Sequence, residues 1–264
     1  MSWKNTGSDE SDNRTRLGEG EQIDDLQCRG LRILQKKGTF RYGTDAVLLA
    51  NYAARSIKNT MRFASRLRNG KRPLRIVDAG TGTGIVPILM YGKLNAEEGY
   101  DPLGARYTAV EIQPDMCELA KRSVELNGIG ECVTVLNADI CDSGLEHGAY
   151  DIVTVNPPYV RTGSGIVSDI GAVARARHEI ERTQEEMLSS ASSLLVHGGY
   201  LFMVNRPDRL TDALSTLRIS GAEPDELTFV HAFVGKPPVM FLLKARKGGG
   251  KGLKVQAPVI LQEV

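Results

Sequence analysis

The order of apolar segments from residue 75 onward predicts an α/β fold with a doubly wound, mostly parallel sheet of seven strands. Two observations carry this prediction: runs rich in Val and Ile alternate with helical segments, and only a short turn separates the last two runs. Strands buried on both faces have this composition. The seven expected strands are residues 75–78, 107–111, 133–136, 151–155, 200–204, 227–233 and 239–244.

Helical segments fit the intervals between these strands. Residues 114–126 carry a proline in the first turn, and residues 179–196 place their apolar residues at helical spacing. Shorter helices are expected at 85–92 and 209–217. The turn around Gly235–Pro238 is too short for a crossover helix, so the last two strands should form an antiparallel hairpin. Residues 247–252 should be a flexible basic loop before a short strand-like tail.

The N-terminal part differs from this pattern. Residues 1–27 contain seven acids, three bases and no apolar run, which predicts a disordered tail. Residues 28–74 are expected to form an N-terminal extension, with a short strand at 31–34 and a helix from Ala46 that is capped by Thr44. Residues 75–264 then make up the main domain.

The composition excludes several classes of protein. The 264 residues are 41% hydrophobic and 25% charged, which is typical of globular chains. Four cysteines show no spacing typical of a zinc site or a disulfide framework. The longest stretch without a charged residue, 187–205, is interrupted by serines and glycines, which disfavours a membrane span. We therefore expect a cytoplasmic protein without a metal ion.

A glycine-rich turn follows the first strand of the sheet. Asp78 to Gly84 reads D-x-G-x-G-x-G and runs directly into a helix, so the backbone can approach a ligand closely. With Gly80 and Gly82 in register, a dinucleotide fingerprint would need a glycine where Ile85 stands. No G-K-[ST] follows, which excludes a Walker loop. The turn thus favours a nucleoside ligand other than NAD or a nucleoside triphosphate.

Acidic residues stand at or just after the ends of three successive strands. They are Asp78, Glu111 and Asp139, and Glu111 is in the position where a ribose diol needs an acceptor. Asp139 could accept a hydrogen bond from an adenine amine. Each acid alone could be an ordinary solvated loop carboxylate, but together they indicate a nucleoside with a cationic tail, such as S-adenosylmethionine.

The fourth strand ends in the most specific motif of the chain, Asn156-Pro157-Pro158-Tyr159. Two prolines fix the backbone and remove two donors, so the loop presents carbonyl oxygens and the Asn156 side-chain oxygen as acceptors. Such acceptors suit a planar –NH2 group that gains positive charge as it attacks a methyl group. Tyr159 supplies an aromatic face on which a base could stack.

These residues carry a resemblance to a known family. Asp78–Gly84 and Asn156–Tyr159 resemble class I S-adenosylmethionine-dependent methyltransferases, which have a Rossmann-like fold and act on exocyclic amino or amide nitrogen. Residues 40–50 (FRYGTDAVLLA) and 176–179 (ARHE) resemble more narrowly the bacterial tRNA(Val) adenine-37 N6-methyltransferases. The expected reaction is therefore methylation of the adenine N6 in the anticodon loop of a tRNA.

The resemblance also implies roles for particular residues. The segment before the sheet would cover the methionine end of the cofactor, which assigns Thr44 and Asp45 to that end, although a plain helix cap is the competing interpretation. A role of His178 and Glu179 stays open. The complete expected cofactor set is Thr44, Asp45, Asp78, Gly80, Gly82, Glu111, Asp139 and Asn156, and the expected catalytic set is Asn156, Pro157, Pro158 and Tyr159.

Basic residues are concentrated in three segments without acids. Residues 29–41, 55–75 and 244–254 hold 18 of the 33 Lys and Arg residues of a chain whose net charge is only +1. Clustered bases favour a phosphate-rich partner and hence RNA, and solvated helix faces are the alternative. A protein-glutamine methyltransferase, a DNA adenine methylase and a non-catalytic cofactor-binding module remain competing functions.

Overall fold

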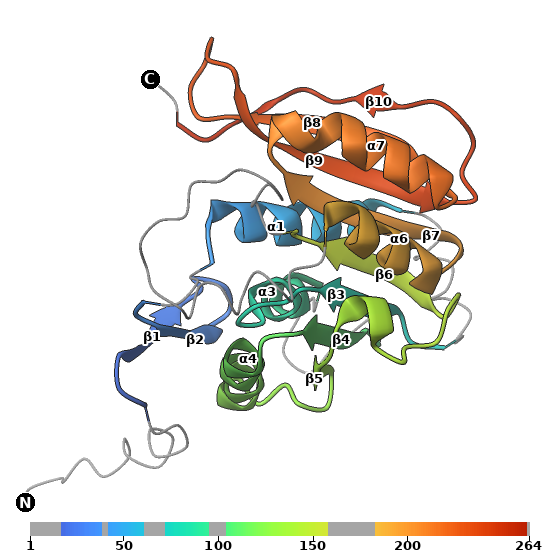
Figure 1. Ribbon diagram of the computed structural model, residues 1–264. Coiled ribbons are helices and arrows are strands. Elements are labelled where there is room, and N and C mark those ends of the chain that lie inside the picture. Colours follow the sequence, from blue (N-terminus) through green and yellow to red (C-terminus); the bar gives the residue numbers. More distant parts are fainter. Residues whose placement is uncertain (1–16, 39–41, 61–71, 95–103, 158–182, 263–264) are drawn as a thin grey trace, which may run out of the picture.

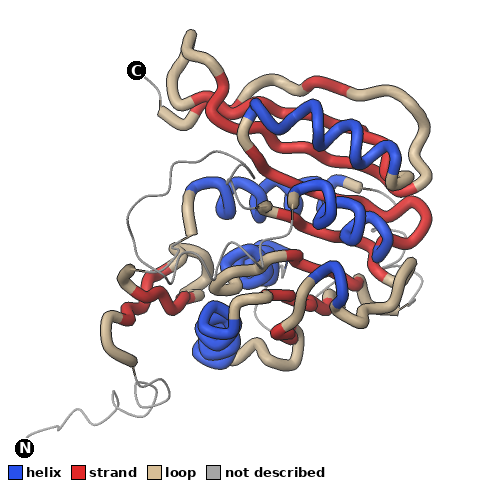
Figure 2. The backbone as a smooth tube through the Cα atoms, viewed as in Figure 1, coloured by secondary structure: helices blue, strands red, loops and turns tan. Residues whose placement is uncertain are grey.

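The computed structural model has an α/β architecture with helices on both faces of one central sheet (Figures 1 and 2). It describes residues 17–38, 42–60, 72–94, 104–157 and 183–262. The strand order is β10-β8-β9-β7-β6-β3-β4-β5, and β11 also pairs with β8, so the sheet has nine strands within these described ranges. The seven expected strands form the run from β8 to β5. The other two, β10 and β11, come from the C-terminal tail.

The bounds of the elements follow the sequence closely. The helices are α1 Thr44–Asn59, α3 Ile85–Leu94, α4 Pro114–Leu126, α6 Gln184–Leu194 and α7 Leu210–Ile219. The strands are β1 Glu21–Asp25, β2 Arg32–Lys36, β3 Arg75–Ala79, β4 Arg106–Glu111, β5 Val133–Asn137, β6 Tyr150–Val155, β7 Leu195–Asn205, β8 Ala222–His231, β9 Pro238–Lys247, β10 Lys254–Val255 and β11 Val259–Ile260. The last long pair, β8 and β9, is antiparallel as expected.

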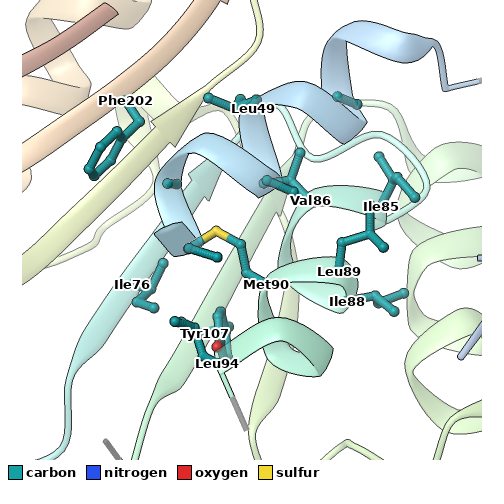
Figure 3. Close-up of a cluster of buried hydrophobic side chains, with 14 of the residues drawn as sticks. Leu49, Ile76, Ile85, Val86, Ile88, Leu89, Met90, Leu94, Tyr107 and Phe202 are labelled. Carbon is teal, nitrogen blue, oxygen red and sulfur yellow. The ribbon is translucent and has the colours of Figure 1, made fainter. Parts of the chain in front are cut away.

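Alternating strand residues build a hydrophobic core on each face of the sheet. In β6, Ile152 packs on the side of α1, α3 and α4, whereas Val153 packs on the side of α6 and α7. The same alternation places Phe202 on the first side and Met203 on the second. Figure 3 shows the first core, in which Leu49 of α1 and Met90 of α3 lie close to strand residues. The sheet is therefore buried on both faces, which explains its continuous apolar runs.

Two expectations about the N-terminal part were wrong. Strand β1 lies inside residues 1–27, so the predicted disordered tail cannot extend beyond residue 20, and residues 1–16 lie outside the described part. Glu21 of this strand forms an ion pair with Arg122 of α4 at 2.8 Å, which ties the β1–β2 hairpin to the main domain. Thr44 is the first residue of α1 rather than its cap, because Gly43 holds the cap position.

The helix expected over residues 179–196 is shorter in the structure. It begins at Gln184, where Thr183 and Glu186 form a reciprocal capping box, and it ends at Leu194. Residues 195–199 belong to β7, and residues 179–182 lie outside the described residues. Within the described ranges, no helix combines the length and apolarity that a membrane crossing requires.

Candidate active site

The functional residues come together at one edge of the sheet. Strands β3, β4, β5, β6 and β7 are all parallel, so their carboxyl ends share this edge. Strands β4 and β5 lie on one side of β3 in the sheet, and β6 and β7 lie on its other side. In open α/β sheets a ligand binds at such a switch point, outside the carboxyl ends. Asp78, Glu111 and Asn156 lie in or next to the strands around it.

The glycine turn has a backbone that only glycine adopts without strain. Gly80, Gly82 and Gly84 have φ angles of 74°, 57° and 87°. Two N–H groups, of Gly80 and Thr81, donate to the carbonyl of Val110 at 2.9 Å and fix the turn against β4. The turn is also closely covered, since a Cβ on Gly80 would lie 3.2 Å from Met187 Cε.

Glu111 is a buried carboxylate held by backbone donors. Its Oε2 accepts from Gly82 N and its Oε1 from Gln113 N, both at 2.8 Å. Burial raises the pKa of Glu111 above its ordinary value, while the backbone N–H groups lower it in part. Each carboxylate oxygen can accept more than one hydrogen bond. The carboxylate therefore has a fixed orientation and still has capacity for the two hydroxyls of a ribose.

Asp78 is buried more deeply than any other carboxylate of the cofactor set. Thr154 Oγ1 donates to its Oδ1 at 2.6 Å, but Oδ2 has no hydrogen-bonding partner among the described residues. Burial raises the pKa of this carboxyl to about 6, against the opposing effects of the Thr154 and Thr81 hydroxyls. An orphaned buried acceptor costs stability, and such costs are typical of functional sites. A cationic ligand group would offset this cost.

We expect the substitution Asp78→Asn to change the pH dependence of stability. Because the pKa of Asp78 is raised in the folded state, its ionisation destabilises the fold above about pH 6, and this penalty disappears below the ordinary value of 3.8. The free energy of unfolding of the variant, relative to the native chain, should therefore rise by up to about 3 kcal/mol between about pH 4 and pH 7. Urea unfolding of both ligand-free proteins at several pH values measures this difference in the free energy of unfolding. Parallel pH curves would contradict the burial of an ionised Asp78.

Asn156 is linked to a residue far away in the sequence. Its Nδ2 donates to Asp45 Oδ2 at 3.0 Å, across a separation of 111 residues. Asp45 lies in the first turn of α1 and is only 7% exposed. Since Nδ2 faces Asp45, the amide plane is set and Oδ1 is turned away from it. The family resemblance assigned Asp45 to the methionine end of the cofactor, and the structure also places it beside Asn156, the asparagine that is expected to be catalytic.

We expect Asp45→Ala to lower kcat about tenfold, because the Asn156 amide loses the acceptor that orients it. The dissociation constant of the cofactor should change much less than kcat if this orienting role is the main one. Asp45→Asn keeps an acceptor oxygen and should restore part of the rate. A raised cofactor dissociation constant with unchanged kcat would instead assign Asp45 to the cofactor alone.

The remaining expected residues have less direct roles in the structure. Asp139 caps a short 3-10 helix, Ile140–Asp142, by accepting from Cys141 N at 2.9 Å. Thr44 is exposed at the start of α1. Pro157 is buried next to Asn156, whereas Pro158, Tyr159, His178 and Glu179 lie outside the described residues.

Sequence reasoning missed a buried amide pair at the same edge. Asn205 Nδ2, at the end of β7, donates to Gln184 Oε1 at 2.6 Å, and both side chains are buried. Gln184 begins α6, and Met187 one turn later reaches the glycine turn. The first turn of α6 therefore spans from β7 to β3 behind the end of β6, where Asn156 lies. No sequence motif marks this pair, because neither residue belongs to a recognisable pattern.

Comparison with protein families defines the class of protein. The model of the methyltransferase small domain matches residues 58–218, which is more than half of the chain. The chain therefore belongs to the methyltransferase small domain family, and the expected enzyme class is confirmed.

Individual relatives narrow the comparison. A tRNA1(Val) (adenine(37)-N6)-methyltransferase of Porphyromonas gingivalis strain W83 is 27% identical over 210 residues, which cover 78% of this chain and 74% of the relative. A release factor glutamine methyltransferase of Chlorobaculum tepidum is 30% identical over 100 residues, covering 37% and 31% of the two chains. A solved structure from Agrobacterium tumefaciens, described as a predicted O-methyltransferase, matches with a TM-score of 0.58 and 26% identity, covering 83% of this chain and 88% of the other.

The residues at the edge fit S-adenosylmethionine, the cofactor expected for this enzyme class. Glu111 offers a fixed carboxylate for ribose hydroxyls, and Asp78 offers a buried acceptor beside the glycine turn. No group of three or more potential metal ligands occurs within the described residues.

Proposed function

We propose that the chain methylates the exocyclic N6 of adenine in RNA, with S-adenosylmethionine as the methyl donor and adenine 37 in the anticodon loop of tRNA(Val) as the target. The observation that carries this proposal is the oriented Asn156 at the end of β6, two strands from Glu111. Similarity to several tRNA1(Val) (adenine(37)-N6)-methyltransferases over most of the chain supports the RNA substrate. A tRNA substrate also places the reaction in the cytoplasm.

Three groups of this chain would hold the cofactor. Glu111 would accept from the ribose hydroxyls, the turn from Gly80 to Gly84 would allow close approach, and Asp78 and Asp45 would face its charged end. When bound, S-adenosylmethionine supplies a methyl group activated by a sulfonium. Asp139 is proposed to lie near the adenine ring, since it follows the end of β5.

Asn156 and Pro157 would hold the target amine. The Asn156 Oδ1 and the Pro157 carbonyl are acceptors for the two hydrogens of a planar –NH2 group. As the nitrogen forms its bond to carbon it gains positive charge, so acceptors already in place are worth more in the transition state than before it. The chain then needs no strong base, because the methylated ammonium is acidic enough to lose its proton to water. Tyr159 would stack on the base.

The basic segments contribute to RNA binding only in part. Arg72 pairs with the buried Asp151 at 2.8 Å, and Lys244 pairs with Asp225 at 3.1 Å, so both stabilise the fold. The exposed members in the described residues include Arg55, Lys58, Lys251 and Lys254. Arg62, Arg66 and Arg68 lie outside the described residues. We propose the exposed bases as phosphate contacts.

Nucleoside mass spectrometry tests the proposed function. The protein is incubated with labelled S-adenosylmethionine and with separate tRNA, rRNA, DNA and protein pools. We expect label in N6-methyladenosine from the tRNA pool, and in adenine 37 when the modified tRNA is sequenced. Label in rRNA or DNA alone would contradict the tRNA assignment.

A protein-glutamine methyltransferase is the second candidate. The match to a release factor glutamine methyltransferase favours it, although this match covers only 37% of the chain. A glutamine amide is also a planar –NH2 group that Asn156 could hold. Methylated glutamine in the protein pool, with no methylated adenosine in any RNA, would establish this alternative.

A further inference from the structure

The turn between β8 and β9 lies at the same edge of the sheet as Asn156. Strand β9 is antiparallel to both β7 and β8, so β8 runs in the direction of β7 and ends at the carboxyl edge. Figure 1 shows this turn projecting beyond the sheet on the side where α1 begins. The turn is internally braced, because His231 Nδ1 contacts the Lys236 carbonyl at 2.5 Å and Lys236 N donates to Phe233 O at 3.3 Å.

This turn carries an exposed apolar surface, which we call the tip patch. Its members are Phe233, Val234, Val239 and Leu261, which are 42%, 64%, 41% and 38% exposed. Leu261 joins the patch because its N–H donates to the His231 carbonyl at 2.9 Å. Four of the eight exposed large hydrophobic side chains of the described residues thus belong to this turn, its flank or the segment paired beside it. Exposed apolar residues concentrated in one part of a surface are typical of an interaction site.

The charge around the tip patch indicates the chemistry of its partner. The turn and its flanks, residues 231–240, contain Lys236 and no Asp or Glu. Lys236 stands within the turn itself and is exposed, whereas Arg246 and Lys254 lie beside Glu223 and Glu226, away from the turn. An exposed aromatic side chain beside a lysine, in a turn without acids, suits unpaired nucleotides, which offer ring faces and phosphates. A polyanion with exposed ring faces therefore fits better than a neutral apolar surface.

The position of the tip patch suits the substrate of the proposed reaction. β8 is the third strand from β6 in the sheet, which corresponds to about 15 Å at the usual strand spacing. A few nucleotides of an unpaired loop can span this distance. A loop whose target adenine reaches Asn156 would thus place neighbouring bases beside Phe233.

We propose that the tip patch binds the unpaired RNA loop next to the target adenine. Phe233 stacks on a base of the loop, and Lys236 contacts a backbone phosphate. This assignment rests on the proposed function, because it concerns the same substrate. Since stacking on an aromatic side chain is sequence-tolerant, the tip patch holds the loop in place while Asn156 selects the reacting amine.

Fluorescence anisotropy with an RNA stem–loop that carries adenine in its loop tests the proposal. Phe233→Ala should weaken binding about 5- to 100-fold, Phe233→Leu nearly as much, and Phe233→Tyr little. The same RNA annealed to its complement should show no effect of these substitutions, because its bases are already stacked. Cofactor affinity, measured by calorimetry, and kcat at saturating RNA should stay at the native level.

Ile219→Ala is the matched control, because Ile219 is 87% exposed at the end of α7 and is not part of the tip patch. Equal stem–loop affinity of the native chain and both Phe233→Ala and Phe233→Leu would overturn the proposal. If the native chain still produces N6-methyladenosine in tRNA, that result leaves the proposed function intact. Absence of this product with the native chain would instead show that the proposed function has failed.

Discussion

Asn156→Ala should lower kcat by about 100-fold or more while leaving the dissociation constant of S-adenosylmethionine almost unchanged. The reason is that the Asn156 oxygen acts on charge that develops on the amine nitrogen in the transition state. Removing one such acceptor typically costs two to three orders of magnitude in kcat, roughly as for an oxyanion-hole donor. Single-turnover rates with saturating RNA and cofactor measure the effect, and calorimetry measures cofactor binding.

A double variant separates the roles of Asn156 and Asp45. We expect Asp45 to affect kcat through its hydrogen bond to the Asn156 side chain, which orients the Asn156 amide. Asp45→Ala combined with Asn156→Ala should therefore be no slower than Asn156→Ala alone, because residues in one network are not additive. If instead the kcat losses of the two single variants multiply in the double variant, Asp45 contacts the cofactor or the base directly. A normal kcat for Asn156→Ala would refute the mechanism.

Much of the fold follows from local sequence patterns. The strands of the sheet are buried on both faces, so their Val- and Ile-rich runs stand out from the helices between them. The sequence also predicts that Asp78, Glu111 and Asn156 lie at one edge of the sheet, because the carboxyl ends of parallel strands are on the same side. The start of α4 at Pro114 could also be located to the residue, because proline is favoured in the first turn of a helix.

Other features depend on contacts that no local pattern encodes. The bond between Asn156 and Asp45 joins residues 111 positions apart, and only the packing of α1 beside β7 brings them together. The polar composition of β1 predicted disorder. The strand is ordered because it pairs with β2 and because its Glu21 forms an ion pair with Arg122. Runs of basic residues were also ambiguous. Arg72 belongs to such a run, yet it pairs with the buried carboxylate of Asp151.

Glu111→Ala should weaken the binding of S-adenosylmethionine by about 10- to 150-fold, which corresponds to roughly 1.5 to 3 kcal/mol for hydrogen bonds to a charged acceptor. Glu111→Gln should be no better, although it preserves the size of the side chain. Gly82 N and Gln113 N both donate to the carboxylate, so one of them would face the NH2 group of a glutamine.

The decisive quantity is the dissociation constant from calorimetry, with thermal unfolding of the ligand-free variants to verify that they fold. Asp115→Ala removes an exposed acid four residues later and should leave binding unchanged. If Glu111→Ala binds the cofactor as tightly as the native chain, Glu111 only braces the glycine turn and the ribose must be held elsewhere.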